Sequence, residues 1–147
     1  MTIYLEDLHV GQRFVSGGRE VTAAAIKAFA ADYDPQPFHL DEGAAGASFF
    51  GGLAASGWHT ACLTMRMLVE TIPFDGGVIG AGGEIRWPRP TRPGAVLHVE
   101  CTVEAITPSR SRPDRGRVRL RCETLNQDGE LAQVLVADLV AFRRPEA

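Results

Sequence analysis

The stretch that most constrains the fold of this chain is an apolar run from Gly57 to about Ile72, which contains no proline and no internal glycine. A predicted buried stripe follows a three- and four-residue spacing through Ala61, Met65, Leu68 and Ile72. Leu63 and Met67 widen this stripe. A helix that is apolar on nearly all sides is usually central and covered by a larger element. The sequence therefore predicts a long central helix.

The larger element is predicted to be a sheet. Four runs rich in valine, isoleucine, leucine and threonine follow the helix: residues 78–87, 95–106, 117–126 and 131–142. In the third run, apolar and charged residues alternate from Arg117 to Thr124, which indicates one buried face and one exposed face. The Asn-Gln-Asp-Gly sequence at 126–129 predicts a hairpin, and the proline-rich segment 88–94 predicts a second turn.

Shorter elements are expected ahead of the long helix. Residues 12–16 predict a short strand, Thr22 is expected to cap a helix over 23–32, and Asp41 a second helix over 42–47. Helices ahead of four long strands describe an α+β domain in which an antiparallel sheet wraps the central helix. No linker or repeat is apparent, so residues 1–147 are expected to form a single domain.

Composition narrows the function classes. The net charge of −3 argues against a nucleic-acid partner, and no apolar run reaches the length of about 18 residues that spans a membrane. The N-terminus is acidic and lacks the features of a signal peptide. Cys62, Cys101 and Cys122 follow no metal-ligand spacing, so we expect buried, reduced thiols in a cytoplasmic protein and no metal site.

The strongest candidate for chemistry is the segment YDPQPFHLD at 33–41. Each proline disfavours the helical conformation in the residue before it, so Asp34 and Gln36 are expected to be extended. Asp34 and His39 are therefore not expected on one helix, and a stiff loop would aim both into one cleft around a shared water. In the alternative interpretation, the aspartate starts an ordinary turn and the histidine is structural.

Three motifs occur in order along the chain: Asp34-x-Gln36-Pro37-x-His39, Ser56-Gly57-Trp58-His59-Thr60, and Arg86-Trp87-x-x-Pro90-x-x-Pro93-Gly94. Together they resemble the MaoC-like dehydratases, a family that includes the (R)-specific enoyl-CoA hydratases. The resemblance covers about residues 5–142. It implies the hotdog fold, in which a sheet wraps a central helix, and dimerisation through the sheet edges.

The hydratase signature of that family is Asp-x-Asn-Pro-x-His, and Gln36 replaces its asparagine. The added methylene shifts the amide by about 1.5 Å, which affects fine geometry or substrate shape more than the acid/base pair. The resemblance implies that Asp34 and His39 activate a water that adds to C3 of a trans-2-enoyl thioester. It also implies that the Gly57 N–H polarises the thioester carbonyl, since free amides at a helix start favour a developing enolate oxygen.

The resemblance further implies an acyl-CoA thioester substrate, no cofactor apart from the coenzyme A of that substrate, and a homodimer or larger homo-oligomer. The residues predicted to bind substrate are Gln36, Ser56, Phe50, Arg86 and Arg89. With Arg92, the two arginines are expected either to meet the coenzyme A phosphates or to form a solvated basic turn.

Several alternatives remain open at this point. His59 is expected to be a hydrogen-bonded core residue rather than a ligand contact, and Trp58 a core or dimer contact. For the function, the alternatives to a hydro-lyase are a hotdog acyl-CoA thioesterase and a non-catalytic module that binds acyl thioesters.

Overall fold

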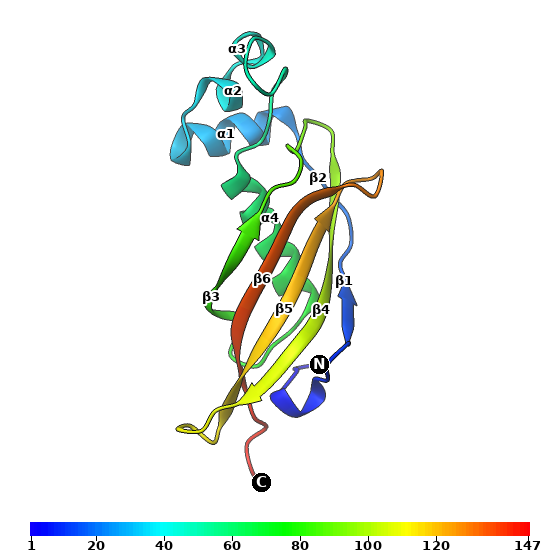
Figure 1. Ribbon diagram of the computed structural model, residues 1–147, viewed down its shortest axis with the longest axis vertical. Helices are drawn as coiled ribbons and strands as arrows, with labels where there is room; N and C mark the ends of the chain where they lie inside the picture. The colour runs from blue at the N-terminus through cyan, green and yellow to red at the C-terminus, as the bar shows by residue number, and fades with distance from the viewer.

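The computed structural model describes residues 1–147, in which an antiparallel sheet wraps one face of a long helix (Figure 1). The helices are the 3₁₀ turn η1 (Leu5–Asp7), α1 (Ala23–Tyr33), α2 (Pro37–Leu40), α3 (Glu42–Gly46) and α4 (Gly57–Thr71). The strands are β1 (Arg13–Val15), β2 (Arg19–Glu20), β3 (Ile79–Arg86), β4 (Val96–Pro108), β5 (Arg115–Leu125) and β6 (Leu131–Phe142). This is the predicted α+β hotdog fold.

The strands follow the order β1-β4-β5-β6-β3, and the short β2 also pairs with β4. Every pairing is antiparallel. The predicted hairpin between β5 and β6 is confirmed, with Leu120 opposite Ala137. The predicted turn is present at Pro93 and Gly94, where Gly94 has a φ of 86°. It does not join neighbouring strands, because β3 pairs with β6 and not with β4, so the segment 88–94 crosses to the other side of the sheet.

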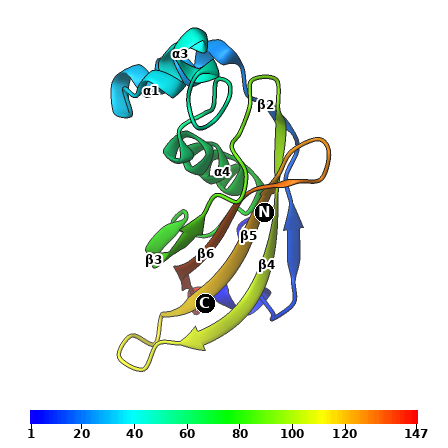
Figure 2. The ribbon, with the colours of Figure 1, turned by 45° about the horizontal axis from the view of Figure 1, so that its top comes forward.

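Side-chain caps start the helices where the sequence predicts them. Thr22 Oγ1 accepts from the Ala25 N–H at 3.1 Å, and Asp41 Oδ2 accepts from the Ala44 N–H at 2.7 Å. Helix α1 ends at Tyr33, since the proline after Asp34 disfavours a further helical residue. Helices α1, α2 and α3 gather at one end of the sheet, where α4 begins (Figures 1 and 2).

The buried face of α4 differs in part from the predicted stripe. Met67, Leu68 and Ile72 are buried as predicted, but Met65 is 44% exposed. The other buried residues of the helix are polar: His59, Thr60 and Thr64. A threonine hydroxyl can be buried when it finds a partner, as Thr64 does with Thr124 at 2.6 Å, and apolar periodicity does not detect such positions.

The opposite face of α4 is apolar and exposed: Trp58, Cys62, Met65 and Val69. The prediction that Cys62 is a core thiol is therefore wrong. The other two thiols are buried as predicted, and Cys101 faces Cys122 on the neighbouring strand. The adjacent Cys101 thiol, together with burial, raises the pKa of Cys122 far above its ordinary value, so this thiol stays protonated.

The sheet supplies the core beneath α4. In β5 the predicted inward residues Val118, Leu120, Cys122 and Thr124 are fully buried, and the arginines alternate with them on the outer face. The hydrophobic core also includes Leu97, Val99 and Val103 of β4. None of the helices is long and apolar enough to cross a membrane.

Strand β3 approaches β6 closely because Gly83 has no side chain. A Cβ at this position would lie 2.4 Å from the Val136 carbonyl oxygen, whereas a Cβ at Gly80 would meet no atom within 4 Å. We expect Gly83→Ala to lower the free energy of unfolding by about 1–3 kcal/mol, since backbone must move to admit the methyl group. Urea unfolding measures the difference, and Gly80→Ala is the matched control. Equal midpoints for the two variants would contradict this explanation.

Candidate active site

The acid/base candidates do not share one helix, as predicted. Asp34 caps the end of α1 with φ −151° and ψ 66°, and Gln36 is extended with φ −100° and ψ 146°. The stretch after Gln36 is not the irregular loop that was predicted, because α2 begins at Pro37 and carries His39. Proline suits the first helical position, where its missing N–H would be unpaired in any case.

The imidazole of His39 is fixed at both nitrogens. Its Nδ1 lies 2.6 Å from the Ala54 carbonyl oxygen, and its Nε2 lies 3.3 Å from Asp34 Oδ2. A carbonyl oxygen only accepts, so Nδ1 carries the proton and Nε2 of the neutral ring is an acceptor. The Ala54 N–H in turn donates to the Phe38 carbonyl oxygen at 3.2 Å, which joins α2 to the segment before α4. Whenever the ring is neutral, Nε2 and the ionised Asp34 form two adjacent acceptors that one water can bridge.

Asp34 is held as an anion by its neighbours. Gln36 Nε2 donates to Asp34 Oδ1 at 2.6 Å. Burial raises the pKa of Asp34, but the hydrogen bonds from Gln36 and Ser56 and the nearby His39 outweigh burial, so the pKa lies below its ordinary value. Ser56 is fully buried and its hydroxyl also accepts from the Trp58 N–H, which caps α4. Ser56 therefore connects the carboxylate to the start of α4.

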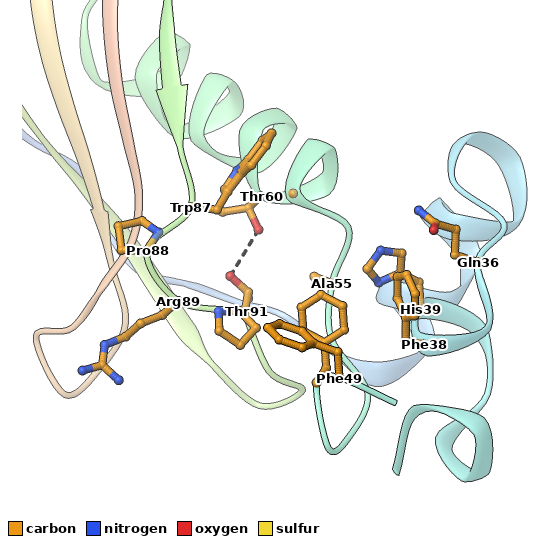
Figure 3. A pocket seen from close by; sticks show the side chains of 13 residues that line it. Gln36, Phe38, His39, Phe49, Ala55, Thr60, Trp87, Pro88, Arg89 and Thr91 are labelled. Carbon is orange, nitrogen blue, oxygen red and sulfur yellow. Dashed lines mark hydrogen bonds between the residues drawn. The ribbon is translucent and has the colours of Figure 1, made fainter. Parts of the chain in front are cut away.

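These residues adjoin a cleft of about 630 Å³ at the end of the sheet where α4 begins (Figure 3). Its lining comprises Gln36, Phe38, His39, Phe49, Phe50, Ala55, Gly57, Thr60, Trp87, Pro88, Arg89, Pro90 and Thr91. Of the predicted site residues, Asp34, Ser56 and Arg86 are not part of this lining. Asp34 contacts His39, which does line the cleft, and Ser56 is the capping residue described above.

Gly57 presents a free amide to the cleft. In the first turn of α4, the N–H groups of Trp58, His59 and Thr60 all donate to Ser56, either to its hydroxyl or to its carbonyl oxygen. The Gly57 N–H comes first in the helix and is left without an acceptor. A Cβ on Gly57 would lie 2.6–2.9 Å from atoms of the Trp87 ring. This position therefore requires glycine because of space.

The predicted cluster of arginines is not gathered at one point. Arg86 lies on β3 with its side chain 79% exposed, away from the cleft lining. Arg92 donates to the carbonyl oxygens of Phe50 at 2.5 Å and Gly52 at 2.9 Å, so it supports the cleft wall instead of facing a ligand. Arg89 does line the cleft, where it pairs with Glu130 at 3.0 Å.

Sequence reasoning found one aromatic wall of the site only in part and missed two of its hydroxyl groups. Phe38, Phe49 and Phe50 form a contiguous aromatic wall, with ring centroids 5.0 and 5.5 Å apart. Thr60 and Thr91 place two buried hydroxyls in the cleft. The position and glycine content of the segment 49–53 predict that it lines or gates the cleft, and Phe49 and Phe50 do line it. Phe38 and Thr60 stood inside the quoted motifs without a predicted role, and Thr91 carried no signal because its contacts depend on the tertiary fold.

The structure corrects in part what was expected of His59 and Trp58. His59 is buried and stacks on Phe29 with centroids 4.8 Å apart, but its Nδ1 has no hydrogen-bond partner. Burial lowers the pKa of His59, so the ring stays neutral. Trp58 is 58% exposed, so it is no core residue of this chain.

No group of three or more His, Cys, Asp or Glu side chains is placed to hold a metal ion.

The comparisons of the sequence and of the fold with known proteins agree with one another. Residues 8–124 match the family model described as "MaoC like domain". The structure is similar to that of a MaoC-like dehydratase from Rhodospirillum rubrum, with a TM-score of 0.96 and 63% identity over 98% of this chain and 99% of that one. It is also similar to an (R)-hydratase from A. caviae involved in PHA biosynthesis, with a TM-score of 0.76 and 28% identity over 95% and 99% of the chains.

A curated relative adds a named activity. A 3-hydroxybutyryl-CoA dehydratase from Methylorubrum extorquens is 31% identical over 121 residues, which cover 82% of this chain and 73% of that protein.

The Gln36 amide is expected to set the acidity of Asp34. Because the pKa of Asp34 is lowered by folding, its ionisation stabilises the protein above about pH 4, and this stabilisation is lost as the pH falls through the folded pKa. Gln36→Ala removes one donor, so the pKa of Asp34 should rise and the acid-dependent stabilisation should shrink. Carboxyl NMR titration measures the pKa. Gln12→Ala, which loses only a contact with the His9 N–H, is the control. An unchanged pKa in Gln36→Ala would contradict this role.

Proposed function

The chain belongs to the MaoC-like domain family, and from this premise we propose that it is a hydro-lyase that adds water to an enoyl-CoA thioester or removes it from a 3-hydroxyacyl-CoA thioester. The named activities of the (R)-hydratase and the 3-hydroxybutyryl-CoA dehydratase support this reaction class. The observation that carries the proposal is the placement of Asp34 and His39, 3.3 Å apart, beside a cleft that also contains the free Gly57 N–H.

The proposed reaction begins with one water bound between Asp34 Oδ2 and His39 Nε2. As the water oxygen bonds to C3 of the enoyl group, His39 takes a proton and Asp34 stabilises the imidazolium that forms. The π electrons of the C2–C3 bond move toward the thioester oxygen, where the Gly57 N–H stabilises the negative charge. The His39 imidazolium then gives its proton to C2, which completes the addition and restores the neutral ring, and the reverse sequence removes water.

The other groups have binding roles in this proposal. The aromatic wall of Phe38, Phe49 and Phe50 receives the acyl chain, and Arg89 at the cleft rim meets the coenzyme A phosphates. Addition of water changes no net oxidation state, so the reaction needs no redox cofactor, and coenzyme A enters only as part of the substrate. We extend the (R) stereochemistry of the named hydratase to this enzyme as part of the proposal.

Substitution of either acid/base residue tests the reaction. Asp34→Asn and His39→Ala should each lower kcat/KM for hydration by about 10²–10⁴-fold, since each removes part of the group that activates the water. Loss of the enoyl absorbance is measured over a panel of straight-chain, branched and dicarboxylic enoyl-CoA thioesters. Full activity in both variants would exclude the proposed mechanism.

The same panel separates the two alternative functions. An acyl-CoA thioesterase would release the free thiol of coenzyme A without a prior loss of the enoyl absorbance. A non-catalytic module would bind acyl-CoA thioesters and leave both signals unchanged in wild-type protein. Hydration without thiol release is the result expected here.

We also propose that the enzyme is a homodimer. Strand β3 is an edge strand with exposed residues, and an unpaired edge is normally covered or paired in a folded protein. The exposed face of α4 adds Trp58, Met65 and Val69, an apolar surface of the kind that marks a protein contact. A second copy that pairs with β3 would bring its own α4 against this face.

A charge on the exposed face of α4 tests the dimer. Light scattering should report two chains for the wild-type protein, and Val69→Glu should shift the mass toward one chain because a buried carboxylate without a partner is costly. Val10→Glu changes an exposed valine near the N-terminus and should leave the mass unchanged. A wild-type protein with the mass of one chain would contradict the proposal.

A further inference from the structure

Two threonine hydroxyls in the cleft have more hydrogen-bonding capacity than the protein uses. Thr60 is 2% exposed and Thr91 is 4% exposed, and both line the cleft. Their Oγ1 atoms lie 3.1 Å apart, and neither hydroxyl has another partner in the chain (Figure 3). Each hydroxyl brings one donor and two lone pairs, so their mutual bond leaves one O–H uncommitted. A buried donor without an acceptor is costly, which indicates that a bound ligand supplies the acceptor.

The position of Thr60 indicates where this acceptor would lie. Thr60 follows Gly57 by three residues in α4, so the two share one face of the first turn. Side chains on a helix lean toward its N-terminus, which places the Thr60 hydroxyl over the turn that begins at Gly57. Both residues line the same cleft. An oxygen bound to the Gly57 N–H would therefore lie beside the Thr60 hydroxyl.

Thr91 is suited to orient the Thr60 hydroxyl. Its carbonyl oxygen accepts from the Ala55 N–H at 2.9 Å, and Pro90 and Pro93 restrict the backbone on either side. When the Thr91 O–H donates to Thr60, the proton of Thr60 is free to point toward a ligand. A donor that itself accepts a hydrogen bond is also strengthened by polarisation.

We propose that Thr60 is a catalytic residue that donates a second hydrogen bond to the thioester carbonyl oxygen, alongside the Gly57 N–H, and that Thr91 is its positioning residue. This inference rests on the proposed hydro-lyase function. The proton stays on Thr60 throughout, and the hydrogen bond strengthens as negative charge develops on the oxygen. Two fixed donors in a water-poor cleft are the arrangement that stabilises an enolate.

A bound enolate tests this role without turnover. Acetoacetyl-CoA ionises to an enolate whose absorbance can be titrated on the enzyme. Removal of a donor disfavours the anion, so Thr60→Val should raise the pH of ionisation of the bound ligand by about one unit, a tenfold change in the equilibrium. Thr60→Ser should restore the wild-type value, and Thr91→Val should give a smaller rise.

Thr71→Val is the matched control, since Thr71 lies at the far end of α4 and its hydroxyl contacts only the Met67 carbonyl oxygen. This variant should ionise the ligand at the wild-type pH. If Thr60→Val also ionises it at that pH, or differs from wild type only in its Kd for the ligand, Thr60 is not a donor to this oxygen. Thermal unfolding of each variant confirms that it is folded, and the Thr60→Ser comparison decides the matter if the valine variant is not.

Kinetics with an accepted enoyl-CoA give a second readout. Thr60→Val should lower kcat by about 10- to 100-fold with little change in KM, since the donor acts mainly in the transition state. A rise in KM at constant kcat would overturn the proposal in favour of simple binding. If the wild-type protein hydrates no enoyl-CoA, the proposed function fails, and the enolate titration still decides whether Thr60 and Gly57 share one oxygen.

Discussion

The contact between Gly57 and the Trp87 ring sets the position of α4 relative to the sheet at the cleft. The ring occupies the space that any Cβ at Gly57 would need. Trp87 is itself fixed, because its Nε1 donates to Oε1 of the fully buried Gln133 at 2.9 Å. Gln133 Nε2 then donates to Thr64 Oγ1 at 3.1 Å, about two turns along α4 from Gly57. Strand β6, the crossover after β3 and the central helix are therefore joined by one polar network beneath the cleft.

The acid/base pair depends on the same helix start from the other side. Ser56 caps α4 and helps to hold the pKa of Asp34 below its ordinary value, and the Ala54 carbonyl oxygen, two residues earlier, accepts from His39. The segment 54–57 thus helps to position all three groups: the Asp34 carboxylate, the His39 imidazole and the free amide of Gly57. A segment that contacts all three groups keeps them at fixed separations, which general acid/base catalysis and stabilisation of an oxyanion both require.

Much of this arrangement could be predicted from local sequence. The prolines after Asp34 and Gln36 indicated that Asp34 and His39 do not share one helix, and Thr22 and Asp41 marked two helix starts. The features that the sequence did not predict all depend on contacts between segments that are distant along the chain. The pairing of β3 with β6, the buried threonines of α4 and the engagement of Arg92 by the segment 50–53 have no counterpart in periodicity or composition.

The contact between Gln36 and Asp34 changes the interpretation of the glutamine that replaces the signature asparagine. From the sequence, its extra methylene relative to asparagine suggests an altered substrate shape. In the structure the longer side chain folds back and donates to Asp34 Oδ1. Its principal effect is therefore electrostatic, since this hydrogen bond offsets the rise in pKa that burial causes at Asp34. Gln36 also belongs to the lining of the cleft, so the residue that helps to keep the carboxylate ionised lies beside any acyl group that enters.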